Sequence, residues 1–154
     1  MQLLTTALHW NFVLVTALCA SLTAQLIKVL LNLFIFHRFI AERMWGAGGM
    51  PSSHSATVCA MVVATGRYCG VNSAVFAVAA VLSIIVMYDA MGVRYETGEQ
   101  AKILNRRFTE WVDQGSDALP FLNGKKLKEM VGHTPIEVLT GAGLGILIGF
   151  VMPL

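Results

Sequence analysis

Four long apolar stretches, separated by polar segments, dominate the pattern of hydrophobic and polar positions along the chain. They cover residues 8–36, 53–68, 71–88 and 138–154, and the last two contain no charged residue. A membrane-spanning helix needs about 20 mostly apolar residues. Each stretch approaches or exceeds that length, so the pattern predicts four membrane-spanning helices.

The segments between these stretches indicate how the helices are connected. Gly70, Asn72 and Ser73 supply turn residues between the second and third stretches, which favours an antiparallel helical hairpin. The other two connections, residues 37–52 and 92–133, are longer and polar. If all four stretches cross the membrane, these two segments lie on the same face of it.

Residues 98–112 within the second polar segment have the periodicity of an amphipathic helix. One stripe is apolar and the basic residues lie off it; the stripe is Ala101, Leu104, Phe108 and Trp111, and the basic residues are Lys102, Arg106 and Arg107. One interpretation is an interfacial helix that lies on the lipid headgroups. The other is an amphipathic helix packed on the surface of the protein itself.

The composition agrees with a membrane protein. Of 154 residues, 56% are hydrophobic and 13% charged, against roughly 45–50% and about 25% in soluble domains. This argues against a disordered chain and against a nucleic-acid-binding module. We therefore predict an all-α fold, a small polytopic transmembrane bundle of about four spans with an interfacial amphipathic helix. We expect it to form one membrane-embedded domain over residues 1–154, with membrane lipid as its partner.

Small residues and cysteines in the apolar stretches are interpreted as packing features. Gly141, Gly145 and Gly149 recur every four residues, which lets two helix backbones approach closely in lipid. A homodimer through this glycine face is one possible use of it. The three cysteines show no CxxC spacing, and we expect them to be small buried hydrophobic residues; they are Cys19, Cys59 and Cys69.

The first candidate for chemistry is the run Gly48-Gly49-Met50-Pro51-Ser52-Ser53-His54-Ser55, which leads into the second stretch. Pro51 suits a turn, and Ser52 or Ser53 can cap the helix. Free N–H groups, hydroxyls and an imidazole at a helix start form an anion site. The alternative is an ordinary N-cap followed by an incidental histidine.

The second candidate is Gly132-His133-Thr134-Pro135-Ile136-Glu137, which leads into the fourth stretch. Thr134 and Glu137 fit a capping box with Pro135 at the first helical position, so Glu137 has a structural explanation. His133 and Glu137 are also four residues apart, which allows the carboxylate to orient the imidazole. A neutral histidine held in this way is a plausible nucleophile or proton-transfer group.

Charged residues near the same face supply further candidates. Arg94 can hold a phosphate in a bidentate manner, and Asp89 can either pair with Arg94 or tune a histidine. Lys28 and Arg38 are additional candidate phosphate ligands, although reaching towards the headgroups would also explain them. Two histidines, several cations and one orienting carboxylate suffice for phosphoryl transfer without a metal. We therefore expect no metal and no cofactor, because the cations outnumber the clustered carboxylates.

These motifs, together with Met87-Tyr88-Asp89-Ala90-Met91-Gly92-Val93-Arg94 and Gly98-Glu99-Gln100-Ala101 with Leu104-Asn105, resemble a divergent branch of the type 2 phosphatidic acid phosphatase superfamily, which includes the vanadium haloperoxidases. The resemblance covers nearly the whole chain, from about Gln25 to Gly149. It implies that His133 is the nucleophile, that Glu137 orients it and that His54 is the general acid. It also implies phosphate ligands, for which we nominate Ser52, Ser53, Arg94, Lys28, Arg38 and Asp89.

Three positions depart from the motifs of that superfamily. Ser53 replaces the glycine of Pro-Ser-Gly-His, and Leu127 stands where an arginine is expected, a role that we assign to Arg94. The Lys-x6-Arg-Pro motif is also altered, since nine residues separate Lys28 from Arg38 and no proline follows. The resemblance implies a membrane phosphohydrolase that acts on a lipid or prenyl phosphate or diphosphate through a phosphohistidine. The alternative is a non-catalytic lipid-phosphate-binding or scaffold protein.

The distribution of basic residues predicts the orientation of the chain. Nine lie in the two long polar segments, whereas Arg67 alone lies at the opposite face and Lys28 within the first stretch; the nine are Arg38, Arg43, Arg94, Lys102, Arg106, Arg107, Lys125, Lys126 and Lys128. Cytoplasmic loops carry the excess of Lys and Arg. We therefore expect an integral protein of a bacterial plasma membrane whose motif-bearing loops face the cytoplasm.

Overall fold

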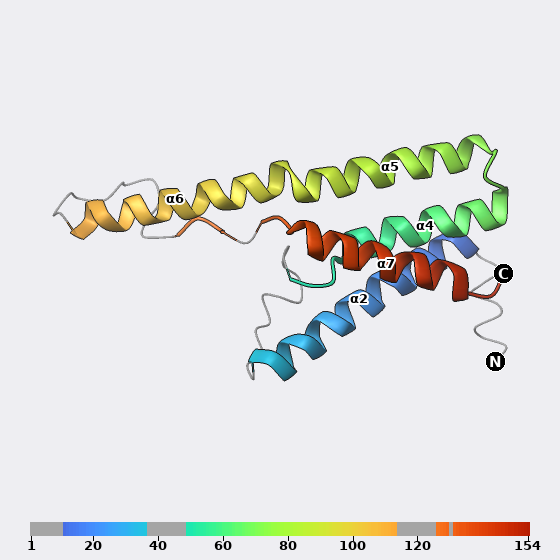
Figure 1. Ribbon diagram of the computed structural model, residues 1–154, viewed down its shortest axis with the longest axis horizontal. Helices are drawn as coiled ribbons and strands as arrows, with labels where there is room; N and C mark the ends of the chain where they lie inside the picture. The colour runs from blue at the N-terminus through green and yellow to red at the C-terminus, as the bar shows by residue number, and fades with distance from the viewer. Residues whose placement is uncertain (1–10, 37–48, 114–125, 130) are drawn as a thin grey trace.

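The computed structural model describes residues 11–36, 49–113, 126–129 and 131–154 (Figure 1). Five helices and no strand make up this described part; they are α2 (Phe12–Phe36), α4 (Ser53–Cys69), α5 (Ala74–Met91), α6 (Val93–Asp113) and α7 (Pro135–Val151). The predicted all-α class is confirmed. Each helix lies within a few residues of the stretch that predicted it.

Two of these helices, α2 and α5, are long and apolar enough to cross a membrane. α4 and α7 have 17 residues each and pack beside them. α2 and α5 run towards one end of the bundle, whereas α4 and α7 start there and run away from it (Figure 1). The result is a small helical membrane bundle. At one end of it, the last turns of α2 and α5 lie near the first turns of α4 and α7. We call this the site-bearing end, because Ser52, His54 and Glu137 lie at the helix starts there.

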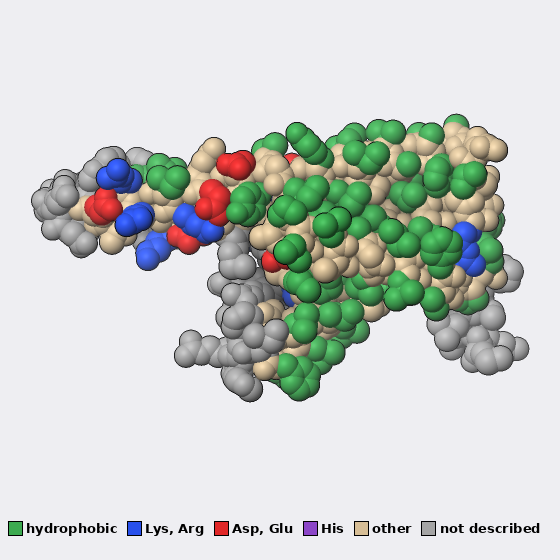
Figure 2. All heavy atoms as spheres, viewed as in Figure 1, with side chains coloured by type: hydrophobic (Ala, Val, Ile, Leu, Met, Phe, Trp, Pro, Cys, Tyr) green, Lys and Arg blue, Asp and Glu red, His purple; other side chains and the backbone are tan. Residues whose placement is uncertain are grey.

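α4 is the central helix, because it packs against α2, α5 and α7. Its core contacts are made by small residues, with Ala20 and Ala24 of α2 against Ala56 and Ala60. Large apolar side chains instead point outwards, and Figure 2 shows them spread over the face formed by α5 and α7. Lipid tails are as apolar as these side chains, so close packing of small residues is what holds such helices together.

Three glycines of α7, Gly141, Gly145 and Gly149, face α4 and its N-cap. A Cβ atom at Gly141 or Gly145 would overlap the backbone of Ser52 or Ala56, respectively, and one at Gly149 would lie 2.7 Å from Cβ of Val63. The interpretation as a packing face is therefore confirmed. This face is covered by α4 of the same chain, so the expectation that a second copy could pack on it is wrong.

α6 follows α5 after Gly92 and continues in nearly the same direction, so it projects beyond the bundle (Figure 1). Charged side chains gather over this projecting helix (Figure 2). Ala101 and Asn105 are buried on it, whereas Leu104 is exposed. The expected apolar stripe is thus displaced, because Gly98 of α6 packs against Glu129 and Val131, and Asn105 bonds to Leu127. The side chain of Trp111 lies outside the described residues.

The cysteines differ in their surroundings. Cys59 is buried and Cys19 half-buried, but Cys69 is exposed. The expectation of a buried residue is wrong for Cys69, because it ends α4 at the edge of the bundle.

Arg67 closes the end of the bundle opposite the site-bearing end. Its Nη1 donates to the carbonyl oxygens of Gly149 and Met152, both at 2.7 Å, and its guanidinium lies 5.7 Å from the ring centre of Phe12. The last carbonyls of a helix have no partner within the helix. Arg67 therefore caps α7 from a neighbouring helix.

We expect Arg67→Met to destabilise the protein by about 1.5–3 kcal/mol, because it removes hydrogen bonds from a charged donor to two carbonyls. Thermal unfolding of the purified protein in detergent measures this. Arg106→Met is the control, since the Arg106 side chain is 85% exposed and surface ion pairs contribute little. Equal unfolding temperatures for the two variants would contradict the capping role.

Candidate functional site

The start of α4 and the start of α7 are joined at the site-bearing end of the bundle. The backbone N–H of Ser52 donates to the carbonyl oxygen of Glu137 at 3.0 Å. Ser52 caps α4, since its Oγ accepts from the backbone N–H of Ser55 at 3.4 Å. The predicted N-cap is confirmed at Ser52, which is fully buried, while Ser53 is nearly so.

His133 and Glu137 form a close pair of titratable groups at the start of α7. Nδ1 of His133 lies 3.1 Å from Oε2 of Glu137. The same oxygen accepts from the backbone N–H of Thr134 at 3.0 Å, and Thr134 completes the predicted capping box of α7. The two explanations for Glu137 therefore both hold, because one carboxylate caps the helix and contacts the imidazole.

His133 is held in place by its backbone as well. Its N–H donates to the carbonyl oxygen of Ala90 at 3.0 Å, which ties the residue to the end of α5. The residue is 3% exposed, and its Nε2 is buried without a hydrogen-bond partner among the described residues. Carboxylate contact at Nδ1 favours the tautomer with the proton there, which leaves a lone pair on Nε2.

Burial lowers the pKa of His133 from its ordinary value. The hydrogen bond and charge of Glu137 oppose this effect, while the charges of Lys28 and His54 lower the pKa further. His133 is therefore neutral near pH 7. The same interactions show that Lys28 and His54 lie within electrostatic reach of His133.

Lys28 is inside the protein. It is 2% exposed, and its alkyl chain lies against Gly49, whose φ of +86° favours glycine. A cation that reached for the headgroups would be exposed, so that explanation is wrong for Lys28. Arg38, the other nominated cation of the first motif, lies outside the described residues.

His54 and Arg94 are exposed at the same end of the bundle. Arg94 donates from Nε to Oδ2 of Asp89, so the Asp–Arg pair that the sequence left open is present. Both side chains remain substantially exposed, at 51% and 39%. The charges of Arg94 and Lys28 both act on His54, so both cations lie near its imidazole.

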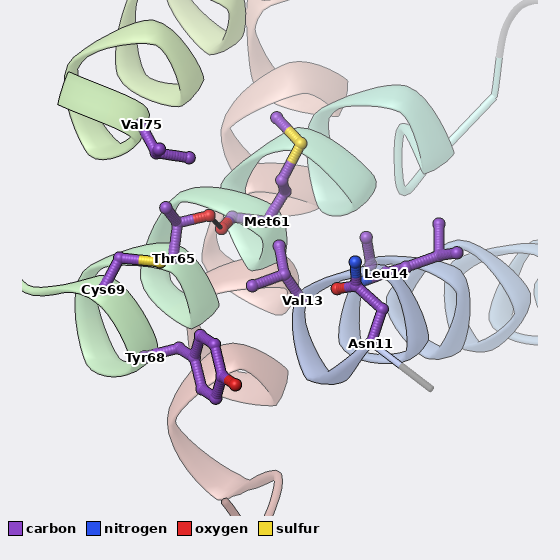
Figure 3. Close-up of a pocket in the computed structure, with 9 residues that line it drawn as sticks. Asn11, Val13, Leu14, Met61, Thr65, Tyr68, Cys69 and Val75 are labelled. Carbon is purple, nitrogen blue, oxygen red and sulfur yellow. Dashed lines mark hydrogen bonds between the residues drawn. The ribbon is translucent and has the colours of Figure 1, made fainter. Parts of the chain in front are cut away.

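Two cavities lie at opposite ends of the bundle. A cavity of about 140 Å³ shares Glu137 and Thr134 with the site and reaches α6 at Tyr95, Glu99 and Lys102. The other, of about 330 Å³, lies between α2, α4 and the start of α5 (Figure 3). Its described lining carries no charged side chain; the lining is Asn11, Val13, Leu14, Ala17, Met61, Thr65, Tyr68, Cys69 and Val75.

Two residues of the site region were not identified from the sequence as carrying a role. Gln25 donates from Nε2 to Oγ of Ser53 at 3.3 Å. Asn105 binds residues that precede His133, since its Nδ2 donates to the Leu127 carbonyl at 2.9 Å and its Oδ1 accepts from the Leu127 N–H at 2.8 Å. In the sequence, only the position of Gln25 three residues before Lys28 indicates that it lies on the same helix face as that candidate phosphate ligand.

Comparison with known proteins supplies a family. A family model described as "Divergent PAP2 family" matches residues 9–148. The chain is also 40% identical, over 99% of its length and 97% of the relative's, to a Bacillus subtilis (strain 168) protein named "Uncharacterized membrane protein YuiD". No solved structure matches the chain.

Proposed function

Because the chain belongs to the divergent PAP2 family, we propose that this membrane protein is a phosphohydrolase that acts on a lipid or prenyl phosphate or diphosphate. One observation carries the proposal: a buried imidazole, His133, contacts a carboxylate through Nδ1 and, in the described part of the chain, has no hydrogen-bond partner at Nε2. Such a nitrogen is a nucleophile ready to attack phosphorus.

The proposed reaction has two steps. In the first, Nε2 of His133 attacks the phosphorus, the bond to the leaving oxygen breaks, and His54 gives its proton to that oxygen. In the second, water attacks the phosphohistidine, His54 takes a proton from the water, and the phosphorus–nitrogen bond breaks to release phosphate. Glu137 holds the Nδ1 proton of His133 and stabilises the positive charge that develops on the ring.

The remaining nominated residues would hold the phosphoryl oxygens. Lys28 supplies a buried charge, and the start of α4 at Ser52 and Ser53 supplies N–H groups and hydroxyls. Arg94, oriented by Asp89, replaces the arginine that is missing at Leu127. We assign Arg38 the same kind of role from its motif position alone.

Phosphate release by the purified protein in detergent tests the proposal. Prenyl phosphate, prenyl diphosphate and phosphatidate serve as substrates, each assayed with and without a chelator. Acid-labile, base-stable phosphate on the protein, lost in His133→Ala, is the expected sign of the intermediate. Turnover that vanishes with the chelator would contradict the mechanism.

A second function, binding of a lipid phosphate without turnover, is supported by particular observations. Arg94 is already paired with Asp89, and Leu127 supplies no cation in place of the expected arginine. Nε2 of His133 is also buried, so a phosphorus atom has no open path to it in this conformation. Saturable binding of these substrates with no phosphate release would favour this function over hydrolysis.

The pH dependence of activity follows from the pKa of His133. The nucleophile must be neutral, and its pKa lies below the ordinary value of about 6.5, so the acid limb of kcat/KM, on which His133 becomes protonated, should lie below about pH 6.5. Glu137 raises this pKa, so Glu137→Gln should move the acid limb of kcat/KM to still lower pH. Both profiles are measured on one substrate, so that its own titration cancels. A shift to higher pH in Glu137→Gln would contradict the assignment.

We propose that the site faces the cytoplasm of a bacterial plasma membrane. The described cations Arg94, Lys102, Arg106, Arg107, Lys126 and Lys128 belong to the site-bearing end, whereas Arg67 at the other end caps α7. Basic residues are retained on the cytoplasmic side.

Cysteine labelling in intact cells checks this orientation. In a background without Cys19, Cys59 and Cys69, a cysteine at the exposed turn residue Asn72 should react with a membrane-impermeant thiol reagent. A cysteine at exposed Lys126 should react only after permeabilisation. The reverse pattern means that the chain is inverted.

A further inference from the structure

Two side-chain atoms are buried without a hydrogen-bond partner in the part of the chain that the structure describes. One is Nε2 of His133, and the other is Oε1 of Gln25 in α2. Buried polar atoms are nearly always paired in folded proteins, so each of these needs an explanation. The proposed function explains the histidine but not the glutamine.

Gln25 lies beside the residues that would hold the phosphate. Its Nε2 donates to Oγ of Ser53, which is preceded by the N-cap of α4 and followed by His54. Lys28 comes three positions after Gln25 in α2, so the two side chains share one face of that helix. A neutral amide and a buried cation from α2 thus lie together next to the start of α4.

The chemistry of the amide indicates what could complete it. A carboxamide has two N–H donors at one end and a carbonyl acceptor at the other, and a serine hydroxyl can bond to either end. A half-turn of the amide exchanges its two ends. Oε1 then accepts from the Ser53 hydroxyl, and the N–H donors of Gln25 occupy the buried position that Oε1 has in this structure. A phosphoryl oxygen is the acceptor that such donors need beside a lysine ammonium.

We propose that Gln25 is a further ligand of the transferred phosphoryl group and donates from its side-chain amide to a phosphoryl oxygen next to Lys28. The proposal rests on the proposed function, because it concerns the same site and the same group. A fixed amide donor stabilises charge that builds up on the oxygens during transfer. Removing one donor of this kind costs about 10²–10³-fold in rate.

Two substitutions test the role of Gln25 in turnover. Gln25→Leu removes the amide, and Gln25→Glu keeps its size and its bond to Ser53 but places a negative charge where the donors were. We expect kcat/KM to fall by about 10²-fold in the first and at least as far in the second. Thr23→Val is the matched control, because the Thr23 hydroxyl donates within α2 to the Cys19 carbonyl at 2.8 Å; its activity should equal that of the wild type.

If these variants do not fold, the role of Gln25 can still be tested by NMR on folded protein that retains Gln25. A protein in which Gln2, Gln100 and Gln114 are replaced by asparagine has Gln25 as its one glutamine, so a selective ¹⁵N label reports its side-chain amide alone. Titration with inorganic phosphate should shift this amide signal and saturate. An amide signal that does not move while ³¹P spectra show bound phosphate overturns the proposal, as does wild-type kcat/KM in Gln25→Leu.

The wild-type protein separates this inference from the function on which it depends. A wild type that neither binds phosphate nor releases it overturns both. If the wild type binds and releases phosphate and Gln25→Leu does so equally well, the role of Gln25 alone is overturned and the histidine mechanism stands.

Discussion

Replacement of His133 by alanine is expected to reduce phosphate release to the background rate. In the proposed mechanism the imidazole forms the bond to phosphorus, so its removal deletes the first step. The structure holds His133 in three ways: its backbone N–H donates to the Ala90 carbonyl, its ring contacts the Glu137 carboxylate, and close packing leaves the residue 3% exposed. Phosphate release from prenyl diphosphate and phosphatidate measures the effect.

Glu137→Gln should slow the same reaction by roughly 10²–10⁴-fold, because the amide orients His133 but carries no charge to stabilise the imidazolium. The variant should still fold. Glutamine also serves at the third position of a capping box, so the start of α7 at Thr134 is preserved. Unfolding temperature therefore separates a catalytic effect of Glu137→Gln from a structural one.

A polar residue whose side chain is satisfied locally provides the control for both variants. The hydroxyl of Thr97 donates to the Val93 carbonyl in α6 at 2.7 Å and is exposed, so Thr97→Val should retain wild-type activity. Substantial phosphate release by folded His133→Ala would show that the nucleophile has been assigned to the wrong residue.

Gly145→Val is expected to disrupt the bundle itself. A Cβ at this position would overlap the Ala56 carbonyl in the middle of the α4–α7 contact. Backbone cannot yield as a flexible side chain does, so the loss should exceed the 1–3 kcal/mol typical of overpacking. Purified variant protein should unfold at a lower temperature or fail to elute as a single species in detergent.

Gly143→Val is the matched control, two residues away on the same helix. A Cβ there meets nothing within 4 Å, and valine is a better helix former than glycine. This variant should be as stable as the wild type or slightly more so. Equal behaviour of the two variants would mean that α4 and α7 do not pack through the glycine face.

Local spacing accounts for the parts of the site that could be predicted. The Ser52 cap, the Thr134–Glu137 capping box and the His133–Glu137 contact each join residues within four positions of one another. Helix geometry brings such residues together in almost any tertiary setting. The family resemblance then added roles to positions that were already marked by their chemistry.

Contacts between distant residues could not be predicted in this way. Gln25 bonds to Ser53, 28 positions away, and Asn105 to Leu127, 22 positions away. Neither residue type is informative alone, since Asn and Gln bond to whatever lies opposite them. The stripe on α6 was displaced for the same reason, because Leu127, Glu129 and Val131 lie against Asn105 and Gly98 while Leu104 is left exposed.

The sequence by itself determined the helices, their approximate ends and the fact that the motif-bearing ends meet at one end of the bundle. The apolar stretches predicted the lengths of the helices, and the capping residues predicted where α4 and α7 begin. Because successive spans must run in opposite directions, the order of the stretches predicted the topology. Only the tertiary structure decided that Lys28 is buried beside Gly49, that the α7 glycines meet α4 and not a second copy, and that Gln25 reaches Ser53. These facts depend on the rotation of each helix about its own axis. In a lipid-facing bundle that rotation is set by close packing of small residues between particular helices, which the hydrophobic pattern does not specify.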